Sequence, residues 1–515
     1  MRKDKIDHHL EKNRAYFNKL YHLPKNRDIV IREFRMGLNH KTEAFLAYFD
    51  GMVDSGAIIE GILKPLLNMD RPQNGKINPE RIKEQVLVSN EVEIGENWKD
   101  TVAGVNYGMV AILIDGCNQS VLVDVKGWEH RPVSQPEVEQ VIHGPLEAFN
   151  ETLRTNIVLI RKAIRNENLV TEILEVGRRS RTSVAVMYMS DLVSPELLAQ
   201  VKKRVASISA DYVGGAGVLE QFIEDHPWML FPQFLSTERP DRSAAFLMEG
   251  KVVIILDGNP TALIAPATLL SLLHSPEDYY LRLPYGNFIR ILRLIAMIIA
   301  VVTPAFYLSI ATHHQEMIPT DFLISLAQAR EQVPFPTIVE IILMEISFEL
   351  IREAGVRVPG IIGNTIGIVG ALILGQATVQ ANMVSPILII VVAITGLASY
   401  SIPNYELGFA LREIRFIYTL AAAFFGFLGI SATLFFTLMV LSSKESFGVP
   451  YLTPLAPNFK SSPDRLTRGP VWSMERRPEY LHPQGTRRQS KISRGWVISR
   501  PARRFGHQTP EKKGD

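Results

Sequence analysis

Residues 294–312 read LIAMIIAVVTPAFYLSIAT, and residues 414–441 read IRFIYTLAAAFFGFLGISATLFFTLMVL. A helix needs about 20 consecutive apolar residues to cross the hydrocarbon core of a bilayer, so each stretch predicts a membrane-spanning helix. The second stretch is long enough to cross with a tilt. Arg290 and Arg293 precede the first stretch, and basic residues at this position favour a cytoplasmic start.

Three shorter segments lie between these two stretches. Residues 338–351 are apolar but include three glutamates, residues 360–378 are glycine-rich, and residues 386–400 are short and apolar. Together the segments predict about four or five crossings. A cytoplasmic C-terminal tail needs an even number, which favours four full spans with residues 338–351 as a partial or pore-lining helix. The basic loop at residues 352–357 argues for five.

The composition limits the classes of function. The 515-residue chain has a formal net charge of +2, whereas nucleic-acid-binding domains are usually strongly basic, so we expect no nucleic-acid partner. Its one cysteine, Cys117, excludes an intramolecular disulfide and a multi-cysteine metal cluster. Residues 1–16 are highly charged and have no apolar core of a secretory signal, so we expect the first domain to be cytoplasmic.

The N-terminal half has the pattern of an α/β fold. Strands are predicted at residues 29–34 and 44–51, followed by a helix from Ile58. Residues 109–116 and 121–125 then form two apolar runs separated by a short turn, which predicts a β-hairpin.

The same signals recur about 140 residues later, which is how an internal duplication shows itself in a sequence. Residues 183–189 match the strand that starts at Ala44, a helix is predicted at residues 195–208, and residues 252–258 match the start of the hairpin. Chance similarity between apolar strands is the alternative. The equal spacing favours two related α/β subdomains with a boundary near residues 145–156.

The predicted fold class is therefore a soluble α/β N-terminal region of two related subdomains, followed by an α-helical membrane bundle. The tail after Leu441 carries about nine more basic than acidic residues and is rich in Pro and Ser, which is typical of disorder. The predicted organisation is a polar arm, two α/β subdomains, a transmembrane helical domain and a basic, largely disordered tail, at residues 1–27, 28–150, 151–288, 289–441 and 442–515.

Sequence motifs of known chemistry are absent. The chain has no P-loop, dinucleotide-binding fingerprint, zinc-ligand spacing or nucleophile elbow, so we expect neither an enzyme nor a cofactor or metal site. Residues 214–217, GGAG, lack the flanking elements of a phosphate cradle and predict a plain loop. His313 and His314 could bind a metal or sense pH, but without a nearby third ligand a solvated loop is favoured.

The carboxylates of residues 338–353 are the strongest candidates for a functional site. Glu345, Glu349 and Glu353 share one helix face with Arg352, whereas Glu340 lies off this stripe. On a single helix the stripe predicts an amphipathic segment at the membrane interface. In a closed ring of chains it would form stacked rings of negative charge that attract cations.

The glycine-rich segment offers a second set of pore-lining candidates. Gly363, Gly367 and Gly370 are spaced four and three residues apart, so they share a helix face and permit close approach of another backbone. Tight helix packing and a pore wall are both compatible with this spacing.

Six motifs carry a resemblance to a known family. They are STERPD at 236–241, VIILDGNP at 253–260, EAGVRVPG at 353–360, GNTIG at 363–367, PNYELG at 403–408 and FGVPYL at 447–452. In this order they resemble the A subunit of the GerA family of spore germinant receptors, over residues 28–457.

The resemblance implies a protein of the inner membrane of a bacterial endospore, with its N-terminal domain cytoplasmic. It implies two partners, a transporter-like B subunit and a lipoprotein C subunit. It also implies a homo-oligomer that passes cations when nutrient binds, and no enzymatic activity. The alternatives are a related channel subunit working with the dipicolinate-release machinery and a secondary transporter, which would need repeated membrane halves.

Overall fold

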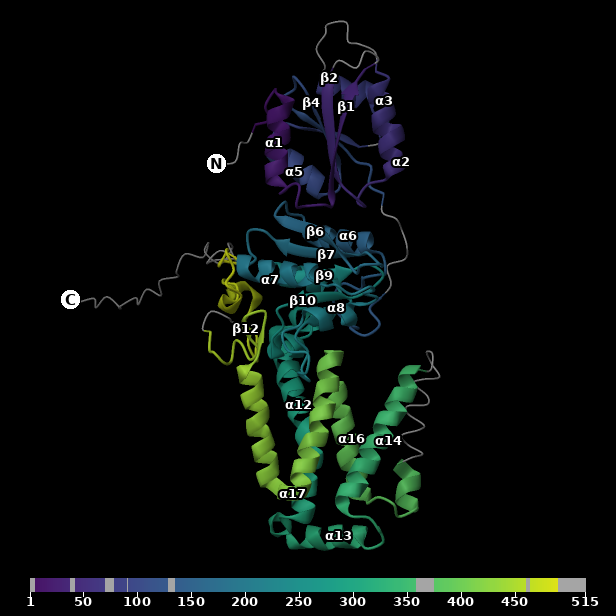
Figure 1. Cartoon of the computed structure of the whole chain (residues 1–515), viewed down its shortest axis with the longest axis vertical. Coiled ribbons are helices and arrows are strands. Elements are labelled where there is room, and N and C mark those ends of the chain that lie inside the picture. Colours follow the sequence, from purple (N-terminus) through teal and green to yellow (C-terminus); the bar gives the residue numbers. More distant parts are fainter. Residues whose placement is uncertain are drawn as a thin grey trace, which may run out of the picture.

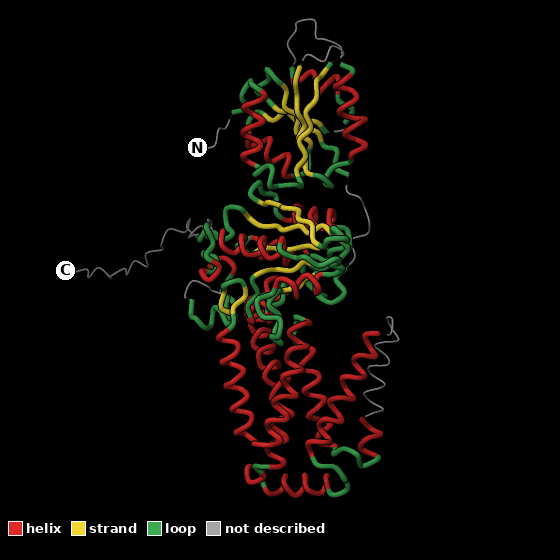
Figure 2. Tube along the Cα trace, in the orientation of Figure 1, coloured by secondary structure: helices red, strands yellow, loops and turns green. Residues whose placement is uncertain are grey.

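The computed structural model places an α/β part above a region of long helices (Figure 1). It describes residues 5–37, 42–69, 78–89, 91–127, 135–357, 375–459 and 464–489. Figure 2 shows that the strands lie in the α/β part, apart from a short pair near the C-terminus, and that the lower region is helical.

The first subdomain is a five-stranded antiparallel sheet between two layers of helices. Its strand order is β1-β2-β4-β5-β3. Helices α1 and α5 cover one face, and α2 and α3 cover the other (Figure 1). The strands are β1 (Ile29–Met36), β2 (Thr42–Phe49), β3 (Val92–Gly95), β4 (Val110–Ile114) and β5 (Ser120–Val123), and the α-helices are α1 (Leu10–Leu20), α2 (Ser55–Ala57), α3 (Lys64–Leu67), α4 (Pro79–Arg81) and α5 (Trp98–Asn106).

The second subdomain repeats this topology, with the strand order β6-β7-β9-β10-β8. Each strand occupies the position of the strand five places earlier in the first sheet, so the predicted pair of related subdomains is confirmed. The strands are β6 (Leu169–Val176), β7 (Thr182–Met189), β8 (Leu235–Thr237), β9 (Val252–Leu256) and β10 (Ala262–Ala265), and the helices are α6 (Leu153–Ala163), α7 (Pro195–Ala206), α8 (Ala216–Ile223), α9 (Pro240–Leu247), α10 (Leu269–Leu273) and α11 (Glu277–Tyr280). Since α8 begins at Ala216, only the first half of GGAG is a loop.

Strand β7 shows how the second subdomain divides its core. Successive side chains of a strand point to opposite faces of the sheet. Val184 and Val186 pack with α7 and α8, whereas Ala185 and Met187 pack with α6 and α9. The apolar cluster that contains Ala185 and Met187 continues into the long helices, so the second subdomain and the helical region share one apolar core.

The helical region includes α12 (Leu283–Thr312), α13 (Thr320–Arg330), α14 (Thr337–Arg357), α16 (Pro386–Tyr400) and α17 (Tyr405–Ser443). Within the described residues, α12 and α17 are long and apolar enough to cross a membrane. Helix α14 is longer than the predicted segment, and α16 has the predicted bounds.

Helix α17 doubles back on itself (Figure 1). Gly426 has φ +56° and ψ −134°, which interrupts the helix, and the Tyr418 hydroxyl lies 3.5 Å from Thr437 Oγ1 across the hairpin. We call residues 405–425 arm 1 and residues 427–443 arm 2. The prediction of one tilted helix over residues 414–441 is therefore wrong. Both arms and the turn are apolar, so hydropathy alone does not reveal the reversal.

The glycines of the hairpin explain why the arms can pack so closely. A Cβ atom at Gly429 would lie 2.1 Å from the carbonyl oxygen of Ala421, so no other residue fits there without moving the backbone. At Gly426 the positive φ is a conformation that other L-residues rarely adopt.

The described residues after α17 return to the α/β part, which differs from the expectation of a largely disordered tail over residues 442–515. Residues 460–463 and 490–515 of this prediction lie outside the described residues. Residues 444–459 and 464–489, here called the C-terminal strap, include β11 (Glu445–Ser446) and β12 (Val449–Pro450). The Ser446 hydroxyl donates to the carbonyl of Gln233 at 2.8 Å, and Tyr451 donates to that of Pro232 at 2.8 Å. Side chain to backbone bonds of this kind leave little periodic signal in a sequence, so composition alone suggested disorder.

Candidate functional site

A group of charged side chains lies inside the apolar helical region, where α14 meets arm 1 of α17. Arg415 Nε is 3.2 Å from Glu345 Oε1, and both side chains are almost fully buried. Glu349 lies 3.4 Å from Arg415, 3.6 Å from Arg412 and 3.5 Å from Arg352. We call these five residues the bundle cluster.

Helical spacing brings the cluster together. Glu345 and Glu349 are one turn apart on α14, and Arg412 and Arg415 are three residues apart on arm 1, so each pair shares a helix face. Arg352 also donates to the Ser399 hydroxyl of α16 at 3.1 Å, so the cluster joins three helices.

The bundle cluster contains two carboxylates and three guanidinium groups, so its formal charge is +1. Neither oxygen of Glu345 has a hydrogen-bond partner in the described part of the chain, and its stabilisation comes from the ion pair with Arg415. Removing one member of a buried ion pair typically costs about 3–5 kcal/mol.

Glu340 lies outside the bundle cluster and contacts the N-terminus of α16. Its Oε2 accepts a hydrogen bond of 2.9 Å from the backbone N–H of Ser385, the residue that caps the N-terminus of α16. Arg330 Nε lies 3.8 Å from the other carboxylate oxygen. A carboxylate at a helix N-terminus is stabilised by the helix dipole and by unpaired backbone N–H groups.

The predicted site residues therefore lie in different environments. Glu345 is buried against Arg415, Glu349 is half-buried, and Glu353 is exposed. The pore-lining role of these carboxylates stays a prediction. Gly363, Gly367 and Gly370 lie outside the described residues.

Sequence reasoning included Arg352 but missed the two arginines that α17 contributes to the cluster. Arg412 and Arg415 stand at the start of the apolar stretch of α17, and charged residues inside such a stretch could have pointed to them. Glu413, on the same arm, is exposed.

The two adjacent histidines follow α12 and lie beside Gly426 in the hairpin turn, where His313 is exposed, as expected for a solvated loop, and His314 is half-buried. The ring of His314 stacks on Phe427 with centroids 4.7 Å apart, and its Nε2 accepts from the Phe427 N–H at 3.4 Å. No group of three His, Cys, Asp or Glu residues suited to a metal occurs among the residues that the structure describes.

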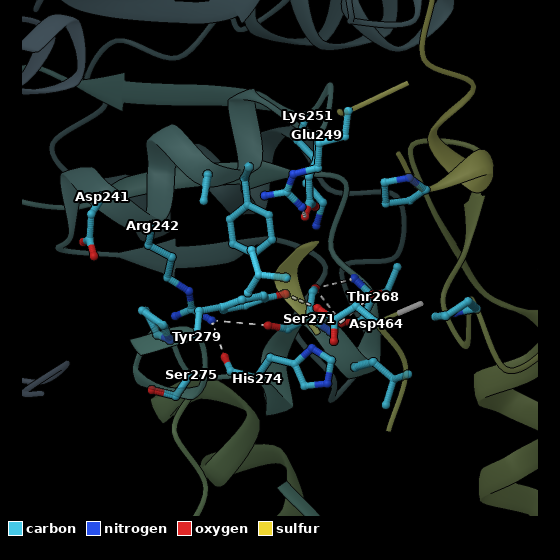
Figure 3. A pocket seen from close by; sticks show the side chains of 18 of the residues that line it. Asp241, Arg242, Glu249, Lys251, Thr268, Ser271, His274, Ser275, Tyr279 and Asp464 are labelled. Atoms are coloured by element: carbon cyan, nitrogen blue, oxygen red, sulfur yellow. Dashed lines mark hydrogen bonds and ion pairs between the residues drawn. The ribbon is translucent and has the colours of Figure 1, made fainter. Parts of the chain in front are cut away.

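A second polar site lies where the second subdomain, α12 and the C-terminal strap meet (Figure 3). Its cavity of about 320 Å³, here called the junction pocket, is lined by Arg242, Lys251, His274, Tyr279 and Asp464 among others. Burial lowers the pKa of Lys251 to about 8 and that of His274 to about 4, so His274 is neutral at pH 7.

An ionic network that includes Asp464 of the junction pocket anchors the N-terminal part of α12. Asp278 Oδ2 accepts from Arg290 Nε at 3.1 Å and from Arg293 at 2.8 Å, and Arg290 also pairs with Asp464 of the strap. The two arginines that favoured a cytoplasmic start of the first span are thus buried in this ionic network.

These features define a class of protein, in which a duplicated α/β region stands on an apolar helical bundle with buried ion pairs. Residues 16–480 match the family described as Bacillus/Clostridium GerA spore germination protein. The chain belongs to this family, which confirms the resemblance carried by the six motifs.

Curated relatives cover most of the chain. Spore germination protein KA of Bacillus subtilis (strain 168) is 39% identical over 91% of this chain and 86% of its own length. Uncharacterized membrane protein YfkQ of the same organism is 37% identical over 88% and 87%. Spore germination protein GerLA of Bacillus cereus is 36% identical over 88% and 92%.

A solved structure is also similar. It is the N-terminal domain of the A subunit of the Bacillus megaterium spore germinant receptor GerK3, which is 27% identical with a TM-score of 0.39. The match covers 52% of this chain and 99% of that one.

Proposed function

We propose that this chain is the membrane subunit of a nutrient-sensing spore germination receptor and that it forms an oligomeric, nutrient-gated cation channel. Its helices would lie in the inner membrane of the endospore, with the α/β part in the cytoplasm. It would work with a transporter-like B subunit and a lipoprotein C subunit. Family membership supports the receptor role, since relatives over most of the chain are spore germination proteins.

The surface of the helices supports a membrane location. Large apolar side chains are widely exposed on α17, with Phe424 at 74%, Leu428 at 72% and Phe435 at 71%. Such a continuous apolar surface is unfavourable in water and indicates lipid or a partner protein. One close relative is also named as a membrane protein.

The bundle cluster is the observation that carries the channel proposal. Ionisable groups inside membrane segments are rare, and they mark ion pathways or contacts with partners. In this chain the guanidiniums of Arg412 and Arg415 neutralise Glu345 and Glu349, and Arg352 leaves a formal charge of +1. The cluster in its present arrangement therefore repels cations. We therefore interpret it as a closed gate. A movement of arm 1 away from α14 would expose the carboxylates to a pathway.

Exposed carboxylates extend this pathway. Glu353 on α14 and Glu413 on arm 1 are both exposed within the helical region. Placing the exposed charge of Glu413 beside lipid is costly, so contact with a neighbouring copy of the chain, or with water between copies, would favour assembly into an oligomer.

Cation flux in liposomes tests the proposal. The complete receptor, reconstituted with its B and C subunits, should pass K⁺ after nutrient is added, and Glu353→Gln or Glu413→Gln should reduce the preference for cations over anions. Glu316→Gln, in the exposed connection after α12, is the matched control and should behave as the parent. Absence of nutrient-dependent flux from a correctly assembled receptor would refute the channel proposal.

A further inference from the structure

A second cavity lies at the boundary between the α/β part and the helical region. Its volume is about 460 Å³, within the usual range of about 300–1,000 Å³ for small-molecule sites. The loop after α8 contributes Trp228 and Leu230, arm 1 contributes Ile417, and arm 2 contributes Phe436 and Val440. We call this cavity the hairpin groove.

The walls of the hairpin groove are apolar. The two threonines that line it, Thr433 and Thr437, donate their hydroxyls to backbone carbonyls of their own helix at 2.9 and 2.8 Å. Ile417 is 49% exposed and Phe436 is 60% exposed, so the groove opens onto the apolar surface of the helices. An apolar chain could therefore enter it from the side.

The upper end of the groove is polar. Lys444, the first residue of the C-terminal strap, directly follows arm 2, and no ion-pair partner of its ammonium group occurs among the residues that the structure describes. Asp225, at the same end, is paired with Arg204 and accepts from the N–H of Phe447 at 2.8 Å, so its charge is already compensated. Of the charged side chains that line the groove, Lys444 is therefore the one left to bind a ligand, and its positive charge suits a phosphate.

The length of the groove matches one leaflet of a bilayer. On this side the lining residues run from Thr433 of arm 2 to Lys444, the residue that follows the arm, and this separation corresponds to roughly 16 Å along a helix. Half of the hydrocarbon core of a bilayer is about 15 Å. A single acyl chain whose headgroup lies beside Lys444 would thus fill the groove.

The exposure of Trp228 also supports a lipid headgroup at this end of the groove. Its side chain is 98% exposed, in a loop at the level where the α/β part meets the long helices. An exposed tryptophan is unfavourable in water but is favoured at the headgroup level of a membrane, where its ring is partly apolar and its N–H can donate.

We propose that the hairpin groove binds one glycerophospholipid, with an acyl chain between the arms of α17, the phosphate at Lys444 and Trp228 at the headgroup level. The proposal rests on the membrane location proposed above. The bound lipid would join the loop after α8, and with it the second subdomain, to the hairpin of α17.

The test combines two measurements on the full-length chain. In vesicles of phosphatidylglycerol brominated on the acyl chain, tryptophan fluorescence should be quenched, and the quenched component should disappear in Trp228→Phe. In detergent, native mass spectrometry should find one retained phosphatidylglycerol per chain. Val440→Phe, which fills the groove, and Lys444→Gln, which removes the cation, should each reduce this retention roughly tenfold.

Leu438→Phe is the matched control, because Leu438 is on arm 2 and exposed but does not line the groove. It should retain lipid as the parent does. If the Val440→Phe protein retains as much phosphatidylglycerol as the parent, the lipid is ordinary annular lipid and the proposal is overturned. A Trp228 that is shielded from both brominated lipid and aqueous iodide would indicate a covering protein instead and also overturn it. Flotation of each variant with vesicles separates these outcomes from failure of the membrane location itself.

Discussion

The Arg161 guanidinium of α6 binds the Asp28 carboxylate that precedes β1, with Nε to Oδ2 at 2.6 Å and Nη2 to Oδ1 at 3.0 Å. Both side chains are almost completely buried, so this pair joins the two subdomains through a dry contact. Thr171 of β6 adds hydrogen bonds to the same region, from its hydroxyl to Asp28 and from its N–H to Asn26.

Asp28→Ala should lower the free energy of unfolding by about 3–5 kcal/mol, because it leaves the charge of Arg161 buried without its carboxylate partner. The measurement is chemical denaturation of the full-length protein followed by circular dichroism. Glu43→Ala is the control, since the Arg35–Glu43 pair is more than half exposed and should contribute at most about 1 kcal/mol. Equal losses in the two variants would contradict the buried contact.

Charge changes in the bundle cluster should alter cation flux in opposite directions. Glu345→Gln raises the formal charge of the cluster from +1 to about +2 and should reduce nutrient-dependent flux, whereas Arg415→Gln lowers it to about 0 and should raise basal flux. The double variant restores the parent charge and should approach parent flux. Reconstituted receptors, checked for assembly by size, provide the measurement. Parent-like flux and ion preference in Glu345→Gln would argue against the pore role.

The hairpin in α17 predicts which ends of this segment share a side of the membrane. In a Cys117→Ala background, cysteines at Tyr405 and Ser443 should react with a membrane-impermeant maleimide from the same side. A cysteine at Phe424, next to the turn, should react from the opposite side. A single spanning helix would place Tyr405 and Ser443 on opposite sides, so labelling of these two positions distinguishes the two topologies directly.

Acid should weaken the junction pocket through His274. Its pKa is about 4 in the folded chain and about 6.5 when unfolded, so between these values the unfolded state binds more protons. Stability should therefore fall as the pH decreases from 6.5 to 4, by at most about 3 kcal/mol. His274→Gln should remove this part of the pH dependence, as measured by the midpoint of thermal unfolding. The backbone carbonyl that accepts from Arg242 is retained in the variant.

The C-terminal strap should stabilise the second subdomain. We expect residues 1–285 to fold as two subdomains, but without Phe447 and Tyr451 the core and the loop at Pro232 lose contacts. Fusing residues 444–489 to this fragment through a flexible linker should raise its melting temperature by several degrees, the shift expected for about 1–2 kcal/mol. The same fusion with Tyr451→Ala and Phe447→Ala is the control. Equal melting temperatures of the fusion and the fragment would indicate that the strap contacts the subdomain without stabilising it.

Local pattern located part of the α/β fold, although it did not predict β3, β6 or β8. The alternation and spacing of apolar residues located the strands that became β2, β4, β7 and β9, and their recurrence revealed the duplication that the two sheet orders confirm. The six family motifs were likewise readable without coordinates, because each is a short run of residues. The length of α16 also followed from hydropathy, since polar residues bound it on both sides.

The sequence by itself determined which segments are apolar, which half carries strands, and that carboxylates occur inside α14. Only the tertiary structure decided that residue 426 reverses α17, that residues 446–451 pack on the second subdomain, and that Glu345 meets Arg415. The physical reason is the distance along the chain over which each kind of information acts. Periodicity and hydropathy report how a residue relates to neighbours within a few turns, whereas the partner of a buried charge is chosen by packing between helices that are distant in the chain, 70 residues apart for this pair.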